Sequence, residues 1–421
     1  MPPARATGGL ESLSQDAPEL MKIAFLYNHD QIHQIAHSVP IAAALARLAP
    51  DVAVVLAVSN EAIAAEVARL WQRLAPGMPA PITRLHLHSR TSRLTAALLG
   101  KLVPANKLLL YRDNLDFFRS LDALVVTERT SLVLKTTYGL DTLPIFLADH
   151  GAGDRAIGFG QSTALFDHIL AAGPKICDRL VADAGVAGDR ISITGYPKFD
   201  FAAAATDTPA PAAPILPMLA NGRPTVLYNP HPSPHLSSWY RQGEAILEWF
   251  YRSSDYNLIF APHIMLFHRR IAVTIDKLRV ARVGRVQERY RNAPNIHVDL
   301  GSVRSTDMTY TNAADIYLGD ASSQIYEFLL RPRPCVFVNA HGPYDPADPN
   351  FAHWQAGPVI TAAGDLGDAL AASRRDHELR YKPVQQMLFA KTFDGTFDGT
   401  GTPSGERAAR RMLELLGKDA A

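Results

Sequence analysis

Short runs of hydrophobic residues alternate along the chain with longer stretches in which apolar positions recur at the helical period. In the first half, the apolar runs predict strands at 23–27, 52–58, 82–88, 123–127, 144–148, 168–172 and 191–194. The amphipathic stretches between them predict helices at 31–48, 61–74, 107–120 and 174–184. Short apolar strands separated by helices are typical of βαβ units, which build a parallel sheet that is buried on both faces.

An Ala- and Pro-rich stretch at 201–223 interrupts this alternation and predicts a linker. The alternation then resumes, with strands predicted at 225–228, 258–261, 296–299, 316–318, 335–338 and 359–361, and helices at 238–252, 275–291 and 322–331. We therefore predict an α/β protein with two Rossmann-like domains, 21–200 and 224–403, that face each other across a cleft. Residues 1–20 predict a disordered leader, and residues 404–421 predict a C-terminal helix that can cross back to the first domain.

The composition argues against several classes of protein. The 42 basic and 41 acidic residues give the 421-residue chain a net charge of +1, so no global field would attract nucleic acid. The two cysteines, Cys177 and Cys335, are too few for a disulfide framework or a Cys-rich zinc site, which suits a reducing cytoplasm. No run of about 18 apolar residues predicts a spanning helix. We therefore expect a cytoplasmic location, with peripheral contact to the inner face of the cell membrane as a further option.

One stretch, 269–291, departs from this charge balance. It carries eight basic residues against two acidic ones, Asp276 and Glu288. On the helix predicted at 275–291, such a surplus is typical of a solvated face, but it also suits contact with an anionic membrane. Both interpretations stay open at this point.

Several familiar motifs are missing from the sequence. There is no GxxxxGKS/T loop, no GxGxxG directly after a strand, no GxSxG elbow and no HExxH pair. These gaps disfavour a P-loop enzyme, a Rossmann dehydrogenase, an α/β-hydrolase and a zinc protease. We predict neither a metal nor a cofactor.

Polar clusters follow several predicted strands, and the carboxyl ends of parallel strands meet at one edge of a sheet. The clusters lie at 149–155, 194–200, 229–233, 261–263 and 319–328. In the first, His150 lies in a Gly-rich turn, where an imidazole with a pKa near 6.5 suits a general base. A histidine that only caps a carbonyl is an equal alternative. His231 and His263 each follow a proline after a strand and suit contact with a ligand, or simply a rigid turn.

The last cluster joins a strand to a helix. Ser322 is a natural N-cap, and Ser322 and Ser323 can form an anion site with the free amides of the first helical turn. Glu327 can bind a sugar hydroxyl or lie in solvent. Gly195 and Lys198, in the second cluster, are explained by a turn alone, with a ligand contact as the alternative.

Residues 314–339, ADIYLGDASSQIYEFLLRPRPCVFVN, resemble the signature of the CDP-glycerol glycerophosphotransferase family. Four further family motifs have similar counterparts, in the same order: an HG motif with a trailing Lys at His150-Gly151 and Arg155, a GYP motif at Gly195–Asp200, a His-Pro pair at Pro262-His263 and an Asp-Gly motif at Phe397-Asp398-Gly399. The chain departs from the family in its HGAGD turn, its NPHP stretch, Ile264 and Glu327.

This resemblance implies a two-domain GT-B fold and a function. The enzyme would transfer a polyol-phosphate group from CDP-glycerol, or a related nucleotide-activated donor, to a hydroxyl of a lipid-linked or saccharide acceptor in cell-surface polymer synthesis. The resemblance implies that His150 is the general base and that His263, Ser322 and Ser323 hold the donor's phosphates. Further donor contacts are expected at Asp320, Glu327, Gly195 and His231, and phosphate or acceptor contacts at Arg155, Asp154 and Lys198.

Two alternatives stay open. A nucleotide-sugar glycosyltransferase or a non-hydrolysing epimerase of the same fold would bind its nucleotide at a similar Ser-containing helix start. A non-catalytic nucleotide-binding protein would keep the cleft without the chemistry.

Overall fold

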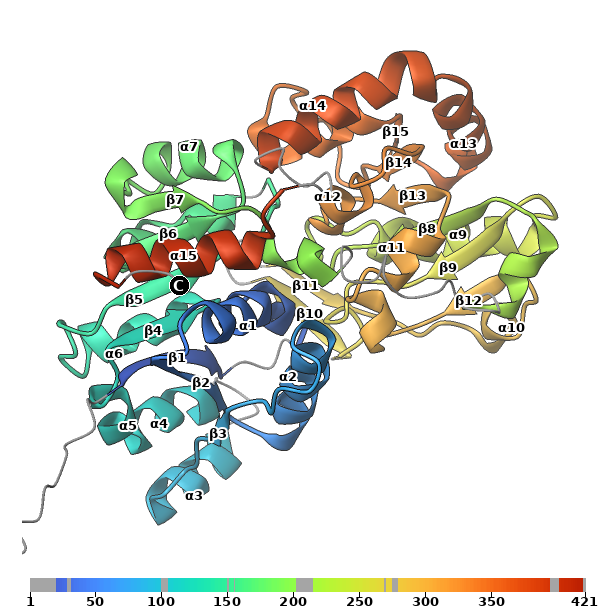
Figure 1. The fold of residues 1–421 in the computed structure, drawn as a ribbon. Helices are drawn as coiled ribbons and strands as arrows, with labels where there is room; N and C mark the ends of the chain where they lie inside the picture. The colour runs from blue at the N-terminus through green and yellow to red at the C-terminus, as the bar shows by residue number, and fades with distance from the viewer. Residues whose placement is uncertain are drawn as a thin grey trace, which may run out of the picture.

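The computed structural model describes residues 20–28, 32–99, 105–149, 151–154, 156–201, 215–268, 270–274, 279–393 and 401–418. Within these ranges the chain forms two α/β halves, which lie on the left and the right of Figure 1. Residues 1–19 of the predicted leader and 202–214 of the predicted linker lie outside the described residues, so the predicted domain boundaries stay predictions.

A seven-stranded parallel sheet forms the centre of the first half, in the order β3-β2-β1-β4-β5-β6-β7. Its strands are β1 (Met21–Tyr27), β2 (Val52–Val58), β3 (Ile82–Arg84), β4 (Ala123–Val126), β5 (Ile145–Ala148), β6 (His168–Ala171) and β7 (Ile191–Ile193). Successive side chains of a strand point to opposite faces, and in β1 Ile23 and Phe25 enter one apolar cluster while Ala24 and Leu26 enter another. Burial on both faces explains why these strands are continuous apolar runs.

Helices supply the partners of both faces. On one face pack α1 (Val39–Leu48) and α2 (Glu61–Leu74); on the other pack α4 (Ala105–Asp113), α5 (Leu115–Arg119), α6 (Val133–Thr136) and α7 (Pro174–Ala182). The bounds of α2 are those predicted, because Asn60 caps it: its side chain accepts a hydrogen bond from the Ile63 amide at 3.0 Å. The sequence analysis missed α3 (Arg90–Leu99).

The second half repeats this plan with a six-stranded parallel sheet in the order β12-β9-β8-β13-β14-β15. The strands are β8 (Thr225–Asn229), β9 (Asn257–Phe260), β12 (Ile296–Val298), β13 (Ile316–Gly319), β14 (Cys335–Val338) and β15 (Val359–Ile360). Its helices are α9 (Trp239–Arg252), α10 (Glu288–Arg291), α11 (Thr309–Ala313), α12 (Gln324–Phe328), α13 (Leu366–Arg375) and α14 (Lys382–Thr392). The sequence analysis did not predict α11, α13 or α14.

Both sheets reverse their strand order at one place. In the first sheet β1 lies beside β4, and in the second β8 lies beside β13. Open α/β sheets bind ligands outside the carboxyl ends of the strands at such switch points. The two switch points are therefore the places where a site is expected, and the prediction of two Rossmann-like domains is confirmed.

The C-terminal helix α15 (Ser404–Leu415) returns to the first half, as predicted, and lies against α1 (Figure 1). Ala408, Ala409, Met412 and Leu413 join the apolar cluster of the first sheet. The carboxylate of Asp200 accepts hydrogen bonds from the backbone amides of Ser404 (3.0 Å) and Gly405 (2.7 Å), which fixes the start of the helix.

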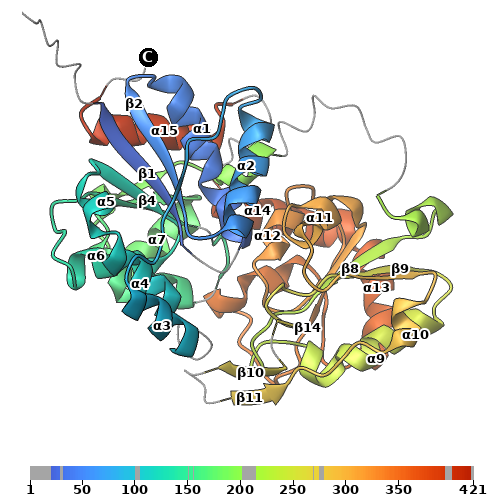
Figure 2. The same ribbon diagram turned by 90° about the horizontal axis from the view of Figure 1, so that it is seen from below.

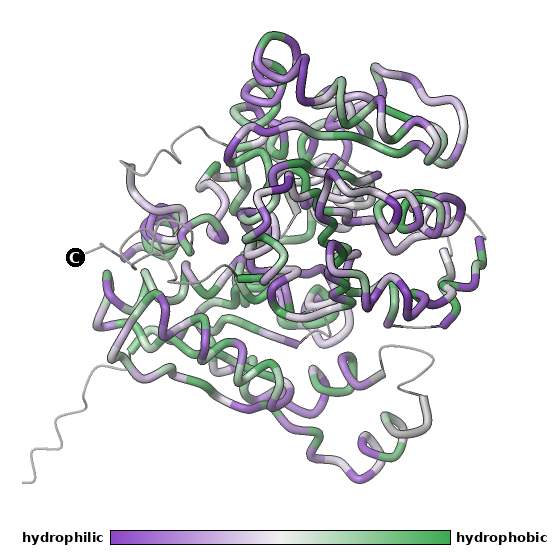
Figure 3. The backbone as a smooth tube through the Cα atoms, turned by 90° about the vertical axis from the view of Figure 1, so that its right-hand side faces the viewer, coloured by the Kyte–Doolittle hydropathy of each residue, from purple (hydrophilic) through white to green (hydrophobic). Residues whose placement is uncertain are grey.

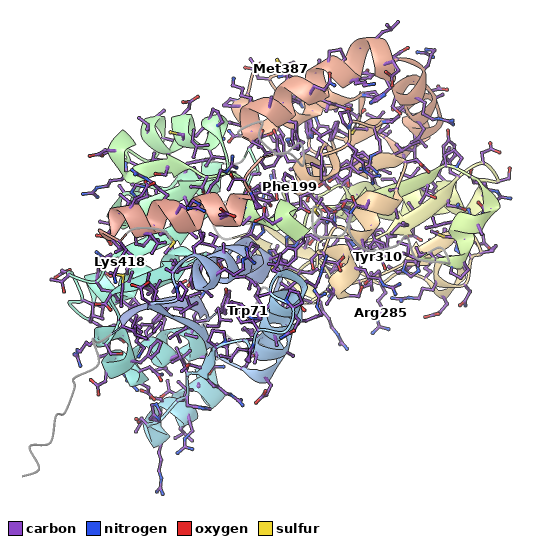
Figure 4. All side chains as sticks on the ribbon, in the orientation of Figure 1. Trp71, Phe199, Arg285, Tyr310, Met387 and Lys418 are labelled. Atoms are coloured by element: carbon purple, nitrogen blue, oxygen red, sulfur yellow. The ribbon has the colours of Figure 1, made fainter. Side chains whose placement is uncertain are left out.

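Apolar packing continues from one half into the other. A single cluster contains Leu147 of β5 and Phe337 of β14, and the tube in Figure 3 shows hydrophobic segments in the interior of the molecule. Phe199, labelled near the centre of Figure 4, contacts Phe389 and Phe393 with ring centroids 5.9 and 4.9 Å apart. The two halves therefore share a core in this arrangement.

Two predicted helices are wrong or shorter than expected. Where a helix was predicted at 275–291, β10 (Ile271–Thr274) and β11 (Arg279–Arg282) form an antiparallel hairpin, followed by the short α10. The β-branched residues of β10 favour a strand, and Gly284 at φ +79° breaks any helix beyond β11. The helix predicted at 322–331 is reduced to the five residues of α12. No helix in the described ranges is both long and apolar enough to cross a bilayer.

Candidate functional site

Two loops meet at the switch point of the second sheet, because Asn229 of β8 pairs with Gly319 of β13. Asp320 follows β13 and is buried. Its carboxylate accepts four hydrogen bonds: from the backbone amides of His231 (2.9 Å), Ala321 (2.7 Å) and Ser238 (2.6 Å), and from the Ser238 hydroxyl (2.8 Å). Burial raises the pKa of Asp320, and these hydrogen bonds oppose that rise. Asp320 thus ties the two loops together; its predicted contact with the donor stays a prediction.

Imidazoles from both halves meet at this edge. The ring centroid of His263, which follows β9, lies 6.0 Å from that of His231 and 5.8 Å from that of His33. His33 belongs to a 3-10 helix, η1 (Ile32–His37), which follows β1 at the switch point of the first sheet. The structure therefore brings the two predicted histidines together and adds His33, which the sequence analysis missed.

The hydrogen bonds of these rings assign their protons. Nδ1 of His231 accepts from the Ser233 amide at 3.0 Å, and Nδ1 of His263 accepts from the Met265 amide at 3.3 Å. A neutral imidazole whose Nδ1 accepts carries its proton on Nε2. Both rings are thus arranged as Nε2 donors, which suits binding of a phosphate oxygen.

A small pocket opens beside His33, between the two halves. Charged residues dominate its polar lining: Glu66, Arg69, Arg73, Lys198 and Asp307. Arg69 is held by Glu66 through two hydrogen bonds of 2.7 Å. The crevice is therefore lined with charges of both signs.

Asp154 follows β5 and is the centre of a buried network between the halves. Its Oδ1 accepts hydrogen bonds from Lys175 (2.8 Å) and from the Tyr326 hydroxyl (2.6 Å). Its Oδ2 accepts from the backbone amide of His353 (3.0 Å) and lies 2.7 Å from Nδ1 of that ring. Nε2 of His353 in turn lies 2.9 Å from the carbonyl oxygen of Asp320. The network therefore links the loop after β5 to the loop after β13.

Electrostatics in this network favour the ionised carboxylate. Burial disfavours the charge on Asp154, but the hydrogen bond from His353 and the charge of Lys175 outweigh it and hold the pKa of Asp154 well below its usual range. Burial lowers the pKa of Lys175, and Asp154 opposes that shift. The predicted contact of Asp154 with a phosphate or an acceptor stays a prediction, because the structure shows only its internal contacts.

The same network places the first and last sequence clusters in contact. A Cβ added to Gly153 would lie 3.0 Å from Cβ of Ser323. Only a residue without a side chain allows this approach comfortably. Ser323 is exposed, whereas Ser322 is buried and its hydroxyl accepts a hydrogen bond from the Gln324 amide at 3.3 Å. The N-cap of α12 is Ser323, one residue later than predicted, and its side chain makes no capping hydrogen bond. Ser322 precedes the cap, and Ser323 is the hydroxyl that a ligand can reach.

Glu327 on α12 is a second buried carboxylate between the halves. Its Oε1 pairs with Nζ of Lys198 at 2.7 Å and accepts from the Tyr196 hydroxyl at 3.3 Å. Its Oε2 is buried and has no hydrogen-bond partner among the described residues. A buried carboxylate oxygen without a donor is costly, so it marks a position that a ligand donor can satisfy.

Gly195 lies against α15. Its φ is +89°, and a Cβ there would clash with the side chains of Arg407 and Ser404. The close approach of α15 accounts for this glycine, and its predicted donor contact stays a prediction.

Some predicted residues cannot be placed. His150, Arg155 and the Phe397–Gly399 motif lie outside the described residues. Among the described residues, no group of three or more His, Cys, Asp or Glu side chains is arranged to hold a metal ion.

The sequence analysis also missed Lys175, Tyr326 and His353. Lys175 lies in the first turn of α7, directly after β6, and this position at a strand end was a usable signal. His353 lies in a 3-10 segment (Pro349–Ala356) far along the chain, and nothing in its neighbourhood predicts the contact with Asp154.

Comparison with solved structures identifies the fold of the chain. No protein-family model and no curated protein matches the sequence. A co-structure of S. aureus MnaA with UDP is similar at a TM-score of 0.58 and 14% identity, covering 96% of this chain and 100% of that one. The wall teichoic acid polymerase TagF, in a crystal soaked with CDPG, has a TM-score of 0.54 and 13% identity, covering 94% and 88%. The glycotransferase of kitacinnamycin has a TM-score of 0.51 and 14% identity, covering 95% and 100%. The chain therefore has the two-domain GT-B fold.

Proposed function

We propose that the protein is a GT-B enzyme that transfers a group from a nucleotide-activated donor. The observation that carries this proposal is the meeting of the two switch points, where His33 of the first half contacts His263 of the second. Strand-end loops that face each other in this way form the usual ligand position of such sheets. The similar structures of MnaA with UDP and of TagF with CDPG support a nucleotide donor.

Within this class we propose a CDP-linked polyol donor such as CDP-glycerol. The support is the resemblance of five ordered motifs to the glycerophosphotransferase family. Four of the five have described residues, and these adjoin one another: Gly153 contacts Ser323, Lys198 pairs with Glu327, and Asp320 binds the loop of His231, whose ring adjoins His263.

The proposed reaction is an in-line displacement at phosphorus. His150, which follows Asp149 in sequence, takes the proton of the acceptor hydroxyl, and the acceptor oxygen forms a bond to the polyol-bearing phosphorus. The bond from that phosphorus to the bridging pyrophosphate oxygen breaks, and its electron pair leaves with CMP. Nε2–H groups of His231 and His263 and the hydroxyl of Ser323 stabilise the negative charge of the leaving phosphate.

A UDP-sugar enzyme, either a glycosyltransferase or a non-hydrolysing epimerase, is the second candidate. The observation that favours it is the similarity to MnaA. The match extends over 100% of the MnaA chain, and its TM-score of 0.58 is higher than the 0.54 for TagF. Glu327, with one buried oxygen open, would serve a ribose or sugar hydroxyl in either case.

A ligand panel separates these candidates. Thermal melts with CMP, CDP-glycerol, UDP and UDP-N-acetylglucosamine should show stabilisation by one nucleotide series, because a ligand at 100 times its Kd adds about 2.7 kcal/mol. Consumption of the stabilising donor is then followed by release of CMP, UDP or an epimerised sugar. Stabilisation without consumption would favour a binding protein, and no stabilisation by any nucleotide would contradict the proposal.

The His150→Ala variant tests the proposed base. We expect turnover to fall about 10²–10⁴-fold, the usual contribution of a general base, with nucleotide binding retained. The matched control is His88→Ala, since His88 is exposed and follows β3, the edge strand of the first sheet. A folded His150→Ala protein with turnover like that of the wild type would contradict the assignment.

A further inference from the structure

His353 is a buried histidine whose two ring nitrogens both face hydrogen-bond acceptors. Nδ1 lies 2.7 Å from Oδ2 of Asp154, and Nε2 lies 2.9 Å from the backbone carbonyl oxygen of Asp320. Neither oxygen can donate to the ring, because the depressed pKa of Asp154 keeps its carboxylate ionised and a carbonyl oxygen carries no proton. A neutral imidazole has one N–H and satisfies only one of these contacts. The hydrogen bonds therefore assign a proton to each ring nitrogen, which makes His353 an imidazolium.

The charged and polar groups around the ring suit this state. Beyond Asp154 lies the ammonium of Lys175, which binds the other carboxylate oxygen at 2.8 Å, so two cations share one anion. Tyr326 donates to that same oxygen at 2.6 Å, and its ring centroid lies 6.5 Å from that of His353. His353 is 2% exposed, so water cannot take the place of a partner. A ring nitrogen without its proton would therefore face an acceptor oxygen at close range, which is a repulsive contact.

The His353 ring joins the two loops that the proposed reaction must hold in register. Asp154 lies in the loop after β5, four positions beyond His150, the proposed base; we refer to this loop as the base's loop. Asp320 lies in the loop after β13, which leads to Ser323, the proposed phosphate contact, and is here the donor's loop. Figures 1 and 2 show α12, which begins directly after Ser323, on the side of the second half that faces the first. A single side chain therefore bridges the base's loop and the donor's loop.

We infer that His353 is a positioning residue for the proposed transfer: its imidazolium holds the base's loop in register with the donor's loop. The inference rests on the proposed function for the identity of the base, whereas the charge of the ring rests on hydrogen bonds alone. The donor's loop has other ties, since Nε1 of Trp354 donates to the Asp320 carbonyl at 2.7 Å and the Asp320 carboxylate accepts four further hydrogen bonds. Loss of the imidazolium should thus leave the nucleotide site formed while the base's loop shifts. A misplacement of about 1 Å can cost about 100-fold in rate.

Two substitutions separate the two hydrogen bonds of the ring. The amide nitrogen of Asn takes the place of Nδ1 and that of Gln the place of Nε2, so His353→Asn keeps a donor toward Asp154 and His353→Gln keeps one toward Asp320. Neither amide can make both bonds. We expect kcat to fall about 10- to 100-fold in each variant, while KM for the donor changes less than about threefold.

The matched control is His377→Gln. His377 is also buried, at 6% exposed, and its Nε2 lies 3.2 Å from Oε1 of Gln385 in the segment between α13 and α14. The control variant should lower thermal stability without lowering kcat, because it removes a buried histidine that bridges no loop of the proposed site.

Nitrogen NMR of the full-length, nucleotide-free protein tests the ring itself. In protein labelled with nitrogen-15 histidine, we expect a ring that carries protons on both nitrogens at neutral pH, where an ordinary histidine is mostly neutral. These signals should be absent from His353→Gln and present in His377→Gln. A single protonated nitrogen on the His353 ring would overturn the imidazolium.

The kinetic outcomes decide the positioning role. A kcat like that of the wild type in both folded His353 variants, an equal fall in the control, or a rise in KM as large as the fall in kcat would overturn it. Failure of the wild type to turn over any nucleotide donor would instead contradict the proposed function. The NMR measurement needs no donor, so the two failures are distinguishable.

Discussion

Asp154 and Glu327 are both buried carboxylates that join the two halves of the chain, but they differ in how completely they are hydrogen-bonded. Both oxygens of Asp154 have donors, from Lys175, Tyr326 and His353. Glu327 pairs with Lys198 through one oxygen only, and the other has no donor among the described residues. The two sites lie on neighbouring residues of α12, since Tyr326 belongs to the first and Glu327 to the second.

This difference separates a structural role from a binding role. The internal hydrogen bonds of Asp154 occupy both of its carboxylate oxygens, which favours a role in holding the loop after β5 in place. A carboxylate with one oxygen open is costly in the free protein and gains when a ligand hydroxyl donates to it. We therefore infer that Asp154 fixes the interface and that Glu327 recognises the donor.

Asp154→Asn should give the largest loss of stability. The substitution leaves the ammonium of Lys175, which is 12% exposed, without its counter-charge. Breaking a buried pair in this way typically costs about 3–5 kcal/mol. Urea unfolding followed by tryptophan fluorescence measures the change.

The control for this variant is Asp183→Asn. Asp183 pairs with Arg179 at 2.8 Å, but it is 43% exposed, and surface pairs of this kind contribute about 1 kcal/mol at most. If the two variants unfolded at the same urea concentration, the Asp154 network would not be a structural element.

The pH dependence of the free energy of unfolding should reveal the contribution of the Asp154 carboxylate. The pKa of Asp154 is lower in the folded protein than its value of about 3.9 in an unfolded chain, so the unfolded state binds more protons as the pH falls. Its contribution is therefore fully present above about pH 5 and is lost as the pH falls below about 4. The gap in stability between wild type and Asp154→Asn should narrow from pH 5 to pH 3. A gap that stayed constant or widened would contradict the depressed pKa.

Glu327→Gln tests the other side of the comparison. Replacing the open oxygen with an amide NH₂ removes the acceptor that we assign to the donor. A hydrogen bond to a charged group contributes about 1.5–3 kcal/mol, so the Kd for the stabilising nucleotide should rise about 10- to 100-fold. Calorimetric titration of the folded variant gives this value.

Asp154→Asn, titrated under conditions where it is folded, is the matched control for Glu327→Gln. Its Kd should change less than about threefold, because Asp154 makes no ligand contact in our assignment. The comparison between the two carboxylates would fail if Asp154→Asn lost as much affinity as Glu327→Gln.

Much of the fold was predictable, because burial on both faces makes the strands of parallel sheets continuous apolar runs. For the strand at 52–58 and the helix at 61–74, the local sequence was enough to predict both ends of the element. The hairpin was not predictable in this way. Its arginines repeat at a spacing that suits a helix, but Ile271 and Arg282 pair across strands only once the chain has turned between them.

The site was predictable only in part, for a related reason. Histidines and serines that follow strands could be found, because parallel strands bring their carboxyl ends to one edge. Partners such as His353 could not, since it contacts Asp154 across 199 positions of sequence. His33 lay within a predicted helix, and only the meeting of the two sheets places it against His263.

The two adjacent serines give the smallest effects and divide in the same way as the two carboxylates. Ser323 is exposed toward Gly153, so Ser323→Ala should weaken nucleotide binding by about 0.5–1.5 kcal/mol, the net contribution of one hydrogen bond, with an unchanged melt of the free protein. Ser322 is buried and accepts from the Gln324 amide, so Ser322→Ala should lower stability by about 1 kcal/mol, the net contribution of one hydrogen bond. Thermal melts with and without nucleotide measure both quantities in one experiment. The opposite outcome would be that Ser323→Ala keeps the full nucleotide-induced shift in melting temperature while Ser322→Ala loses it. The buried hydroxyl would then be the ligand contact. In that case, an unsatisfied or exposed polar group would not mark the ligand-binding residues of this interface.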